Sequence, residues 1–144
     1  MKKRPAAIAA TMMLVAVSLA GCGGGSAYCD AVKGDQKNLD SFGKTRTNDA
    51  YASYVTTFQA IAKVAPKGVV KDWKTLADVT QGVLDAQKKA KIALEDMTDT
   101  DKVAKVGQDE LAEINEAYEA FNGTTDQRTA VVENVSQECD ITLS

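Results

Sequence analysis

Histidine is absent from this chain of 144 residues, and proline, aromatic residues and cysteine are scarce. Without histidine, no serine or cysteine nucleophile can be activated in a Ser-His or Cys-His arrangement, and the commonest metal ligand is missing. We therefore expect no enzymatic activity, no cofactor and no metal site. Proline occurs only at Pro5 and Pro66, so a single proline interrupts the chain beyond its first few residues.

Three acidic residues, Asp96, Asp99 and Asp101, lie close together between two expected helices. Such a group invites comparison with a calcium-binding loop. The segment lacks the glycine at position 6 and the glutamate at position 12 that an EF-hand loop requires. We therefore expect these side chains to cap a helix or to be solvated.

No apolar run of the sequence is long enough to cross a membrane, because a spanning helix needs about 20 such residues. The longest candidate, residues 6–20, follows Lys2, Lys3 and Arg4 and contains many small residues. A basic start, a short apolar core and small residues before a cut are typical of a cleavable secretory signal.

This run ends in Leu19-Ala20-Gly21-Cys22, which resembles the lipobox of bacterial lipoproteins. The resemblance implies that residues 1–21 are a signal peptide and that Cys22 receives a diacylglyceryl thioether and becomes the first mature residue. An ordinary secretory signal is the alternative, but Leu19 would then stand where the general signal peptidase requires a small residue. We expect a protein of the cell membrane, held by lipid on the extracytoplasmic face.

Residues 22–26 are predicted to be the lipidated cysteine and a flexible tether, and residues 27–144 a single domain. A Gly/Ser linker of about five residues has a root-mean-square reach of about 12 Å, so the domain should lie close to the bilayer. Removal of the three basic residues of the signal leaves 14 basic and 20 acidic residues, a net charge of −6. That charge disfavours nucleic acid and anionic headgroups as partners, but two acyl chains are sufficient for anchoring.

Cys29 and Cys139 remain once Cys22 is assigned to lipid. They lie near opposite ends of the domain, and the compartment outside the membrane permits disulfides. Metal binding is the competing role, but neither cysteine has a second one nearby and histidine is absent. We predict a Cys29–Cys139 disulfide.

Apolar residues of the domain recur at helical spacing and predict an all-α fold, an antiparallel bundle of four to five helices closed by this disulfide. The first helix is predicted over residues 27–42 and the second over 48–64, with Asn48 or Asp49 as N-cap. After a turn around Pro66, a heptad seam predicts a third helix up to residue 97: Leu76, Val79, Val83, Ala86, Ala90, Ala93 and Met97.

A fourth helix is predicted from the Thr98-Asp99-Thr100-Asp101 capping group to residue 121. Its seam consists of Ala104, Gly107, Leu111, Ile114, Tyr118 and Phe121. Asn122-Gly123 is expected to end this helix in the left-handed conformation. Thr124 and Gln127 predict a capping box for a last helix that ends at Cys139.

The domain as a whole is similar to the small helical lipoproteins of high-GC Gram-positive bacteria, most of which have no assigned function. The similarity is carried by Tyr28-Cys29, by Ala65-Pro66 with Asp72-Trp73, and by Glu138-Cys139-Asp140-Ile141-Thr142-Leu143. Asp140 departs from this pattern, in which glycine often follows the second cysteine. These short motifs imply no catalytic role.

Two functions from different classes are compatible with this sequence. The first is a non-catalytic binding or scaffolding module that meets an envelope protein or a cell-wall component, with the acidic face of Glu110, Glu113 and Glu116 as one possible surface. The alternative is a module that binds a small ligand or ion in a pocket between helices. The candidate lining of that pocket is Tyr51, Tyr54, Trp73 and Tyr118.

Overall fold

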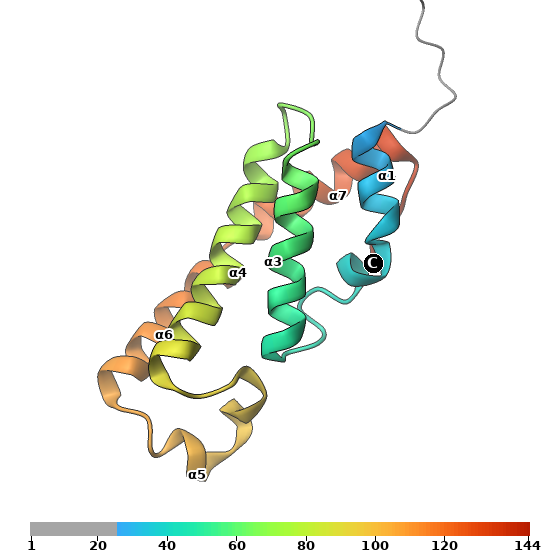
Figure 1. Ribbon diagram of the computed structural model, residues 1–144. Coiled ribbons are helices and arrows are strands. Elements are labelled where there is room, and N and C mark those ends of the chain that lie inside the picture. Colours follow the sequence, from blue (N-terminus) through green and yellow to red (C-terminus); the bar gives the residue numbers. More distant parts are fainter. Residues whose placement is uncertain (1–25) are drawn as a thin grey trace, which may run out of the picture.

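The computed structural model describes residues 26–144, which form seven α-helices and one 3-10 helix and contain no strand (Figure 1). The elements are α1 (Ala27–Gly34), α2 (Gln36–Asp40), α3 (Asn48–Ala62), α4 (Val70–Ala90), η1 (Leu94–Thr98), α5 (Thr100–Val103), α6 (Gln108–Asn122) and α7 (Thr125–Cys139). The all-α class is therefore confirmed. The predicted signal peptide, Cys22 and the glycines of the tether lie outside the described residues.

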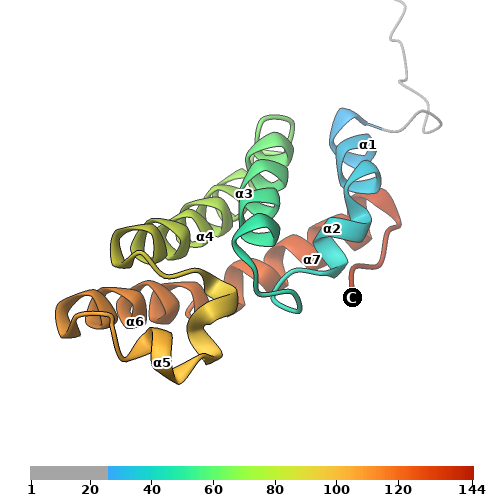
Figure 2. The same ribbon diagram turned by 60° about the horizontal axis from the view of Figure 1, so that its bottom comes forward.

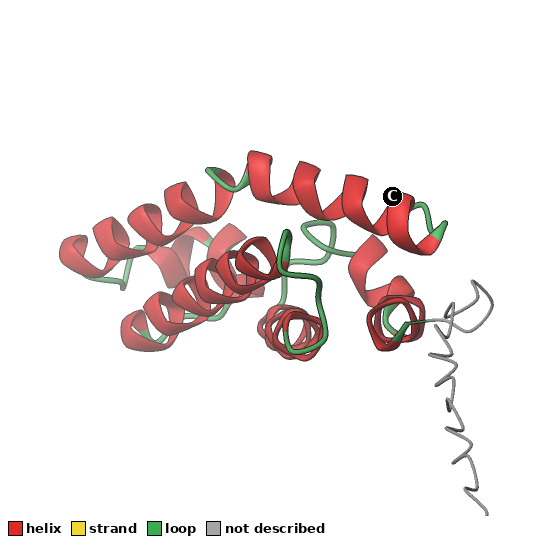
Figure 3. Cartoon of the chain, turned by 90° about the horizontal axis from the view of Figure 1, so that it is seen from above, coloured by secondary structure: helices red, strands yellow, loops and turns green. Residues whose placement is uncertain are grey.

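The helices form two layers. Helices α1, α3 and α4 lie side by side, and α6 and α7 follow one another along a gently bent line that crosses them (Figures 2 and 3). Helices α3 and α4 run antiparallel as a hairpin (Figure 1). The core lies between the layers, where the apolar stripes of the helices meet.

Helix α3 agrees with the sequence pattern over nearly its whole length. Its apolar residues repeat at helical spacing on one face, which is buried at Tyr51, Tyr54, Val55, Phe58, Ile61 and Ala62. The N-cap is Thr47 and not Asn48 or Asp49, because the Thr47 hydroxyl accepts a hydrogen bond from the Ala50 amide at 3.2 Å. The Asn48 side chain is used elsewhere and accepts a hydrogen bond from the Leu94 amide.

Helix α4 ends at Ala90, so the predicted continuation through Ala93 and Met97 is wrong. Lys91 adopts the left-handed conformation with φ of 56°, and the Ile92 amide donates to the Gln87 carbonyl. This is the hydrogen bond of a Schellman motif, which ends a helix. Ile92 and Leu94 are buried after the turn, so their burial favours the reversal over another turn of helix.

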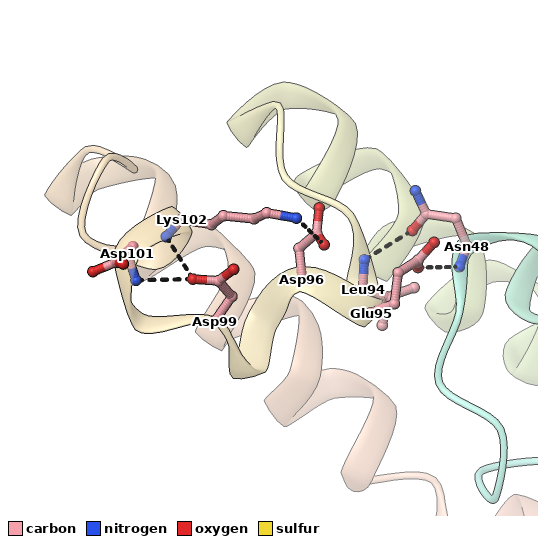
Figure 4. Close-up of polar contacts among 7 residues, drawn as sticks. All are labelled: Asn48, Leu94, Glu95, Asp96, Asp99, Asp101 and Lys102. Carbon is pink, nitrogen blue, oxygen red and sulfur yellow. Dashed lines mark hydrogen bonds and ion pairs between the residues drawn. The ribbon is translucent and has the colours of Figure 1, made fainter.

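The predicted fourth helix is divided into α5 and α6, and Ala104 and Gly107 lie outside both. Asp99 caps α5, since its carboxylate accepts hydrogen bonds from the Asp101 and Lys102 amides (Figure 4). Gly107 has extended backbone angles and stands as N-cap of α6. Glycine is unfavourable inside a helix but tolerated at its cap, which explains the break.

The predicted first helix is also divided, at Asp35, into α1 and the five-residue α2. The Asp35 carboxylate accepts a hydrogen bond from the Thr57 hydroxyl of α3 at 3.3 Å. The bend directs Leu39 of α2, and Phe42 behind it, toward the core. Ser26, assigned from the sequence to the tether, is instead the N-cap of α1, with its hydroxyl accepting from the Cys29 amide.

The junction between α6 and α7 differs from the sequence prediction in two respects. Gly123 has φ of −68°, so no left-handed residue ends α6. The capping box of Thr124 and Gln127 does not form, because the Thr124 hydroxyl donates to the Phe121 carbonyl at 2.7 Å. Helix α7 therefore continues almost in the direction of α6 (Figure 3).

A disulfide joins Cys29 of α1 to Cys139 at the end of α7, with the two α-carbons 5.2 Å apart. The predicted closure of the bundle is therefore confirmed. The bridge holds α1 against α7, and Tyr28 and Val32 of α1 are buried beside it.

Replacement of Cys139 by serine should lower the melting temperature while most helix content remains at room temperature. A loop that spans 110 positions contributes about 2–4 kcal/mol through the restricted unfolded chain. Thermal melting followed by circular dichroism measures the loss. The double variant Cys29→Ser/Cys139→Ser should lose no more than the single one. Two thiols that react without prior reduction in the wild-type domain would contradict the bridge.

Candidate functional site

The four aromatic residues proposed to line a pocket do not line one together. Tyr51, Tyr54 and Trp73 are at most 1 % exposed, and each is used in packing. Tyr51 stacks on Phe121 with ring centroids 5.4 Å apart, and the Tyr54 hydroxyl donates to the Ser41 carbonyl at 2.6 Å. These rings belong to the core.

Tyr118 is half-buried on α6 and lies close enough to Tyr51 to raise its pKa. Burial raises the pKa of both hydroxyls above the ordinary tyrosine value. Gln87 is fully buried on α4. It is a polar residue one helical turn after Val83, on the side of the helix that the heptad seam predicts to be apolar.

Trp73 connects three helices through a buried chain of hydrogen bonds. Its indole Nε1 donates to the Tyr28 hydroxyl at 3.2 Å, and that hydroxyl donates to Asn134 Oδ1 at 2.9 Å. Burial raises the pKa of Tyr28, while the hydrogen bond from Trp73 acts in the opposite direction. The chain links α4, α1 and α7 at the end of the molecule that holds the disulfide.

Trp73 also forms part of the wall of an apolar cavity of about 160 Å³. Five segments meet around it: α2, the segment after α2, the α3–α4 hairpin, α7 and the residues that follow α7. Its aromatic walls are Phe42, Phe58 and Trp73, and its aliphatic walls are Leu39, Leu76, Val131, Val132 and Leu143. The remaining lining residues are Arg128 and Ser144.

Arg128 is the one charged side chain in this lining. Its Nε donates to the Thr124 hydroxyl at 3.0 Å, and its Nη2 donates to the Phe121 carbonyl at 2.9 Å. The guanidinium lies over two rings, 5.0 Å from the centroid of Phe42 and 4.7 Å from that of Phe121. Burial lowers its pKa, but an arginine remains charged at neutral pH.

The residues after α7 cover one side of the cavity. Three side chains hold this segment: Gln36 donates to the Thr142 carbonyl, Asp40 accepts from the Ser144 amide, and Lys44 donates to the Ser144 oxygen. Leu143 therefore lies against the cavity with its neighbours fixed by hydrogen bonds.

The acidic residues of α6 differ in their exposure and in their partners. Glu116 is exposed, Glu110 is half-buried, and Glu113 forms an ion pair with Lys89 of α4. This pair raises the pKa of Lys89. Because both partners are largely exposed, the pair contributes little to stability.

The acidic residues around η1 and α5 act as caps and partners of cations. Asp99 caps α5, Asp96 pairs with Lys102 at 2.6 Å, and Glu95 accepts from the Asn48 amide (Figure 4). Within residues 26–144, no three histidine, cysteine, aspartate or glutamate side chains converge closely enough to hold a metal ion.

No family model matches this chain, and neither a curated protein nor a solved structure matches it. Among the helices at residues 26–144, none has the length and apolar character needed to cross a bilayer.

Sequence reasoning missed the cavity and Arg128. A signal was present, because Arg128 lies three residues before Val131 and shares a helical face with it and with Val135. A single cationic side chain on the apolar face of a helix is unusual and indicates a partly buried charge. The other walls come from segments whose convergence no local pattern predicts.

Removal of the hydroxyl in Tyr28→Phe should destabilise the domain by about 1–2 kcal/mol, because buried partners lose a hydrogen bond. Trp73→Phe should cost more, because it removes the indole donor and also leaves a space in the core. The two losses should be less than additive, since they share one bond. Urea unfolding followed by circular dichroism measures this cycle. Tyr54→Phe is the matched control and should add independently to Trp73→Phe, because its hydroxyl contacts Ser41. Full additivity of the Tyr28 and Trp73 changes would contradict a hydrogen bond between these two side chains.

Proposed function

We propose that this protein is a lipid-anchored, extracytoplasmic membrane lipoprotein whose domain is a non-catalytic binding or scaffolding module. The observation that carries the proposal is the Leu19-Ala20-Gly21-Cys22 string after a basic start and a short apolar run. The Cys29–Cys139 disulfide supports it, because structural disulfides persist in oxidising compartments outside the cytoplasm.

The anchor would also orient the domain. Helix α1 begins at Ala27, five residues after Cys22, at the end of the molecule where α1 and α7 are bridged. The segment η1–α5 and the start of α6 lie at the opposite end (Figure 1). That distal end carries most of the acidic side chains discussed above, so repulsion from an anionic membrane surface favours the same orientation.

The distal acidic surface, defined as Glu110, Glu113 and Glu116 of α6, is the proposed contact for an envelope protein or a cell-wall component. These residues belong to the first nine residues of α6, a helix that starts at the distal end (Figure 1), and their one ion pair within the described residues is with Lys89. Its charge favours a cationic partner.

Native mature protein should carry a diacylglyceryl group on Cys22 as its first residue. Mass spectrometry of the N-terminal peptide, isolated from membranes of the source organism, measures this directly. Cys22→Ala should abolish the modification and the membrane association, whereas Cys139→Ser should leave both intact. An unmodified N-terminus at another residue would refute lipid anchoring.

Charge reversal of the distal acidic surface, Glu110→Lys/Glu113→Lys/Glu116→Lys, should leave the melting temperature within about 3 °C, because none of the three side chains is buried in the core and substitutions at the surface rarely affect folding strongly. The same variant should lose capture of its partner from cell-envelope extracts. Reversal of three exposed acids elsewhere, Asp78, Asp126 and Glu133, is the matched control and should retain capture. Equal capture by both variants would exclude this surface as the contact.

The cavity beside Arg128 favours the second candidate function, binding of a small ligand. It is apolar, it lies between helices, and it has a single charged group at its wall. This function is compatible with anchoring and does not depend on the distal acidic surface.

A further inference from the structure

We propose that the cavity beside Arg128 binds a small amphiphilic anion, a carboxylate carried on a compact apolar group about the size of a benzene ring. The apolar group would occupy the space between Phe58, Leu76 and Val131, and the carboxylate would pair with the guanidinium. This proposal deepens the ligand-binding alternative above and is independent of lipid anchoring.

The size and composition of the cavity define the apolar part of the ligand. An engineered apolar cavity of about 150 Å³ stays dry and takes up benzene. The present cavity has about 160 Å³, is open to solvent on one side, where Val132 is exposed, and is lined by three aromatic and five aliphatic side chains. Water against these apolar walls finds few polar partners, so an apolar group of matching size is the favoured occupant.

The charge of Arg128 defines the polar part. Its Nε and Nη2 have hydrogen-bond partners, but Nη1 has none among the described residues. Arg128 takes part in neither of the two ion pairs of the described region, Lys89–Glu113 and Lys102–Asp96. A half-buried guanidinium without a counter-ion is unfavourable, and a carboxylate compensates it best through a charge-assisted bond.

The guanidinium is also preorganised for this contact. Two hydrogen bonds and the faces of Phe42 and Phe121 fix its plane, so binding a carboxylate requires little further ordering of the side chain. A lysine in this position would be free to turn toward solvent. The arrangement therefore selects an anion over a neutral or cationic analogue.

The test uses the mature chain with Cys22→Ser, which keeps the disulfide and avoids detergent. Three probes share one ring and differ in charge: phenylacetate, benzyl alcohol and benzylamine. Phenylacetate should give saturable methyl shifts in ¹³C NMR at Leu39, Leu76 and Val131, with a Kd at least about tenfold below that of benzyl alcohol. Benzylamine should bind most weakly. Absence of saturable shifts up to about 10 mM, or equal affinity for the three probes, would overturn the proposal.

Arg128→Gln should remove the preference for phenylacetate, while Arg46→Gln, at an exposed loop arginine, should retain it. Val131→Phe should fill the cavity and abolish binding of all three probes while Arg128 is kept. The charge series on the unaltered cavity decides the question even if Arg128→Gln fails to fold. Myristate is the last probe, because its acyl chain is too large for a cavity of this volume. Tighter binding of myristate than of phenylacetate would contradict a compact site.

Discussion

The disulfide between Cys29 and Cys139 is the constraint on which one whole side of the core depends. Helices α1 and α2 have eight and five residues, and helices of that length are marginal on their own in water. They are held instead by burial of Tyr28, Val32 and Leu39 and by the covalent bond to α7. Leu39 and Phe42 also line the cavity, so the disulfide stabilises one wall of the cavity through α1 and α2.

The Arg128 side chain has two roles: it forms hydrogen bonds at the α6–α7 junction, and it places a positive charge beside the cavity. At the α6–α7 junction it donates to the Phe121 carbonyl near the end of α6 and to the Thr124 hydroxyl, which itself donates to that carbonyl. The same bonds place a fixed positive charge at the edge of an apolar cavity. A purely structural role needs only the first of these features. A neutral residue able to donate to the carbonyl would serve it without the cost of half-burying a charge.

The sequence predicted the class of fold, the disulfide and the long apolar faces, because each of these follows from local spacing or from residue counts. Helix α3 is the clearest case, since its aromatic and aliphatic residues repeat at one helical period. The heptad seam misled at Ala93 and Met97, where burial of Ile92 and Leu94 outweighed continued helix. The cavity could not be predicted, because its walls combine residues from Leu39 to Ser144 that only tertiary packing brings together. The Tyr28–Trp73 bond, between residues 45 positions apart, was beyond reach for the same reason.

The position of the cavity within the fold links it to the proposed anchoring. Trp73 and Leu76 belong to the first two turns of α4, and the segment over the cavity follows directly after Cys139. The site is therefore nearer the bridged end of the molecule than the distal η1–α5 segment (Figure 1). A domain tethered at Cys22 would hold the cavity on its membrane-proximal side and the acidic residues on the outer side. The cavity proposed for a small amphiphilic anion and the proposed acidic contact surface would then lie on different sides of the same module and would not compete for space.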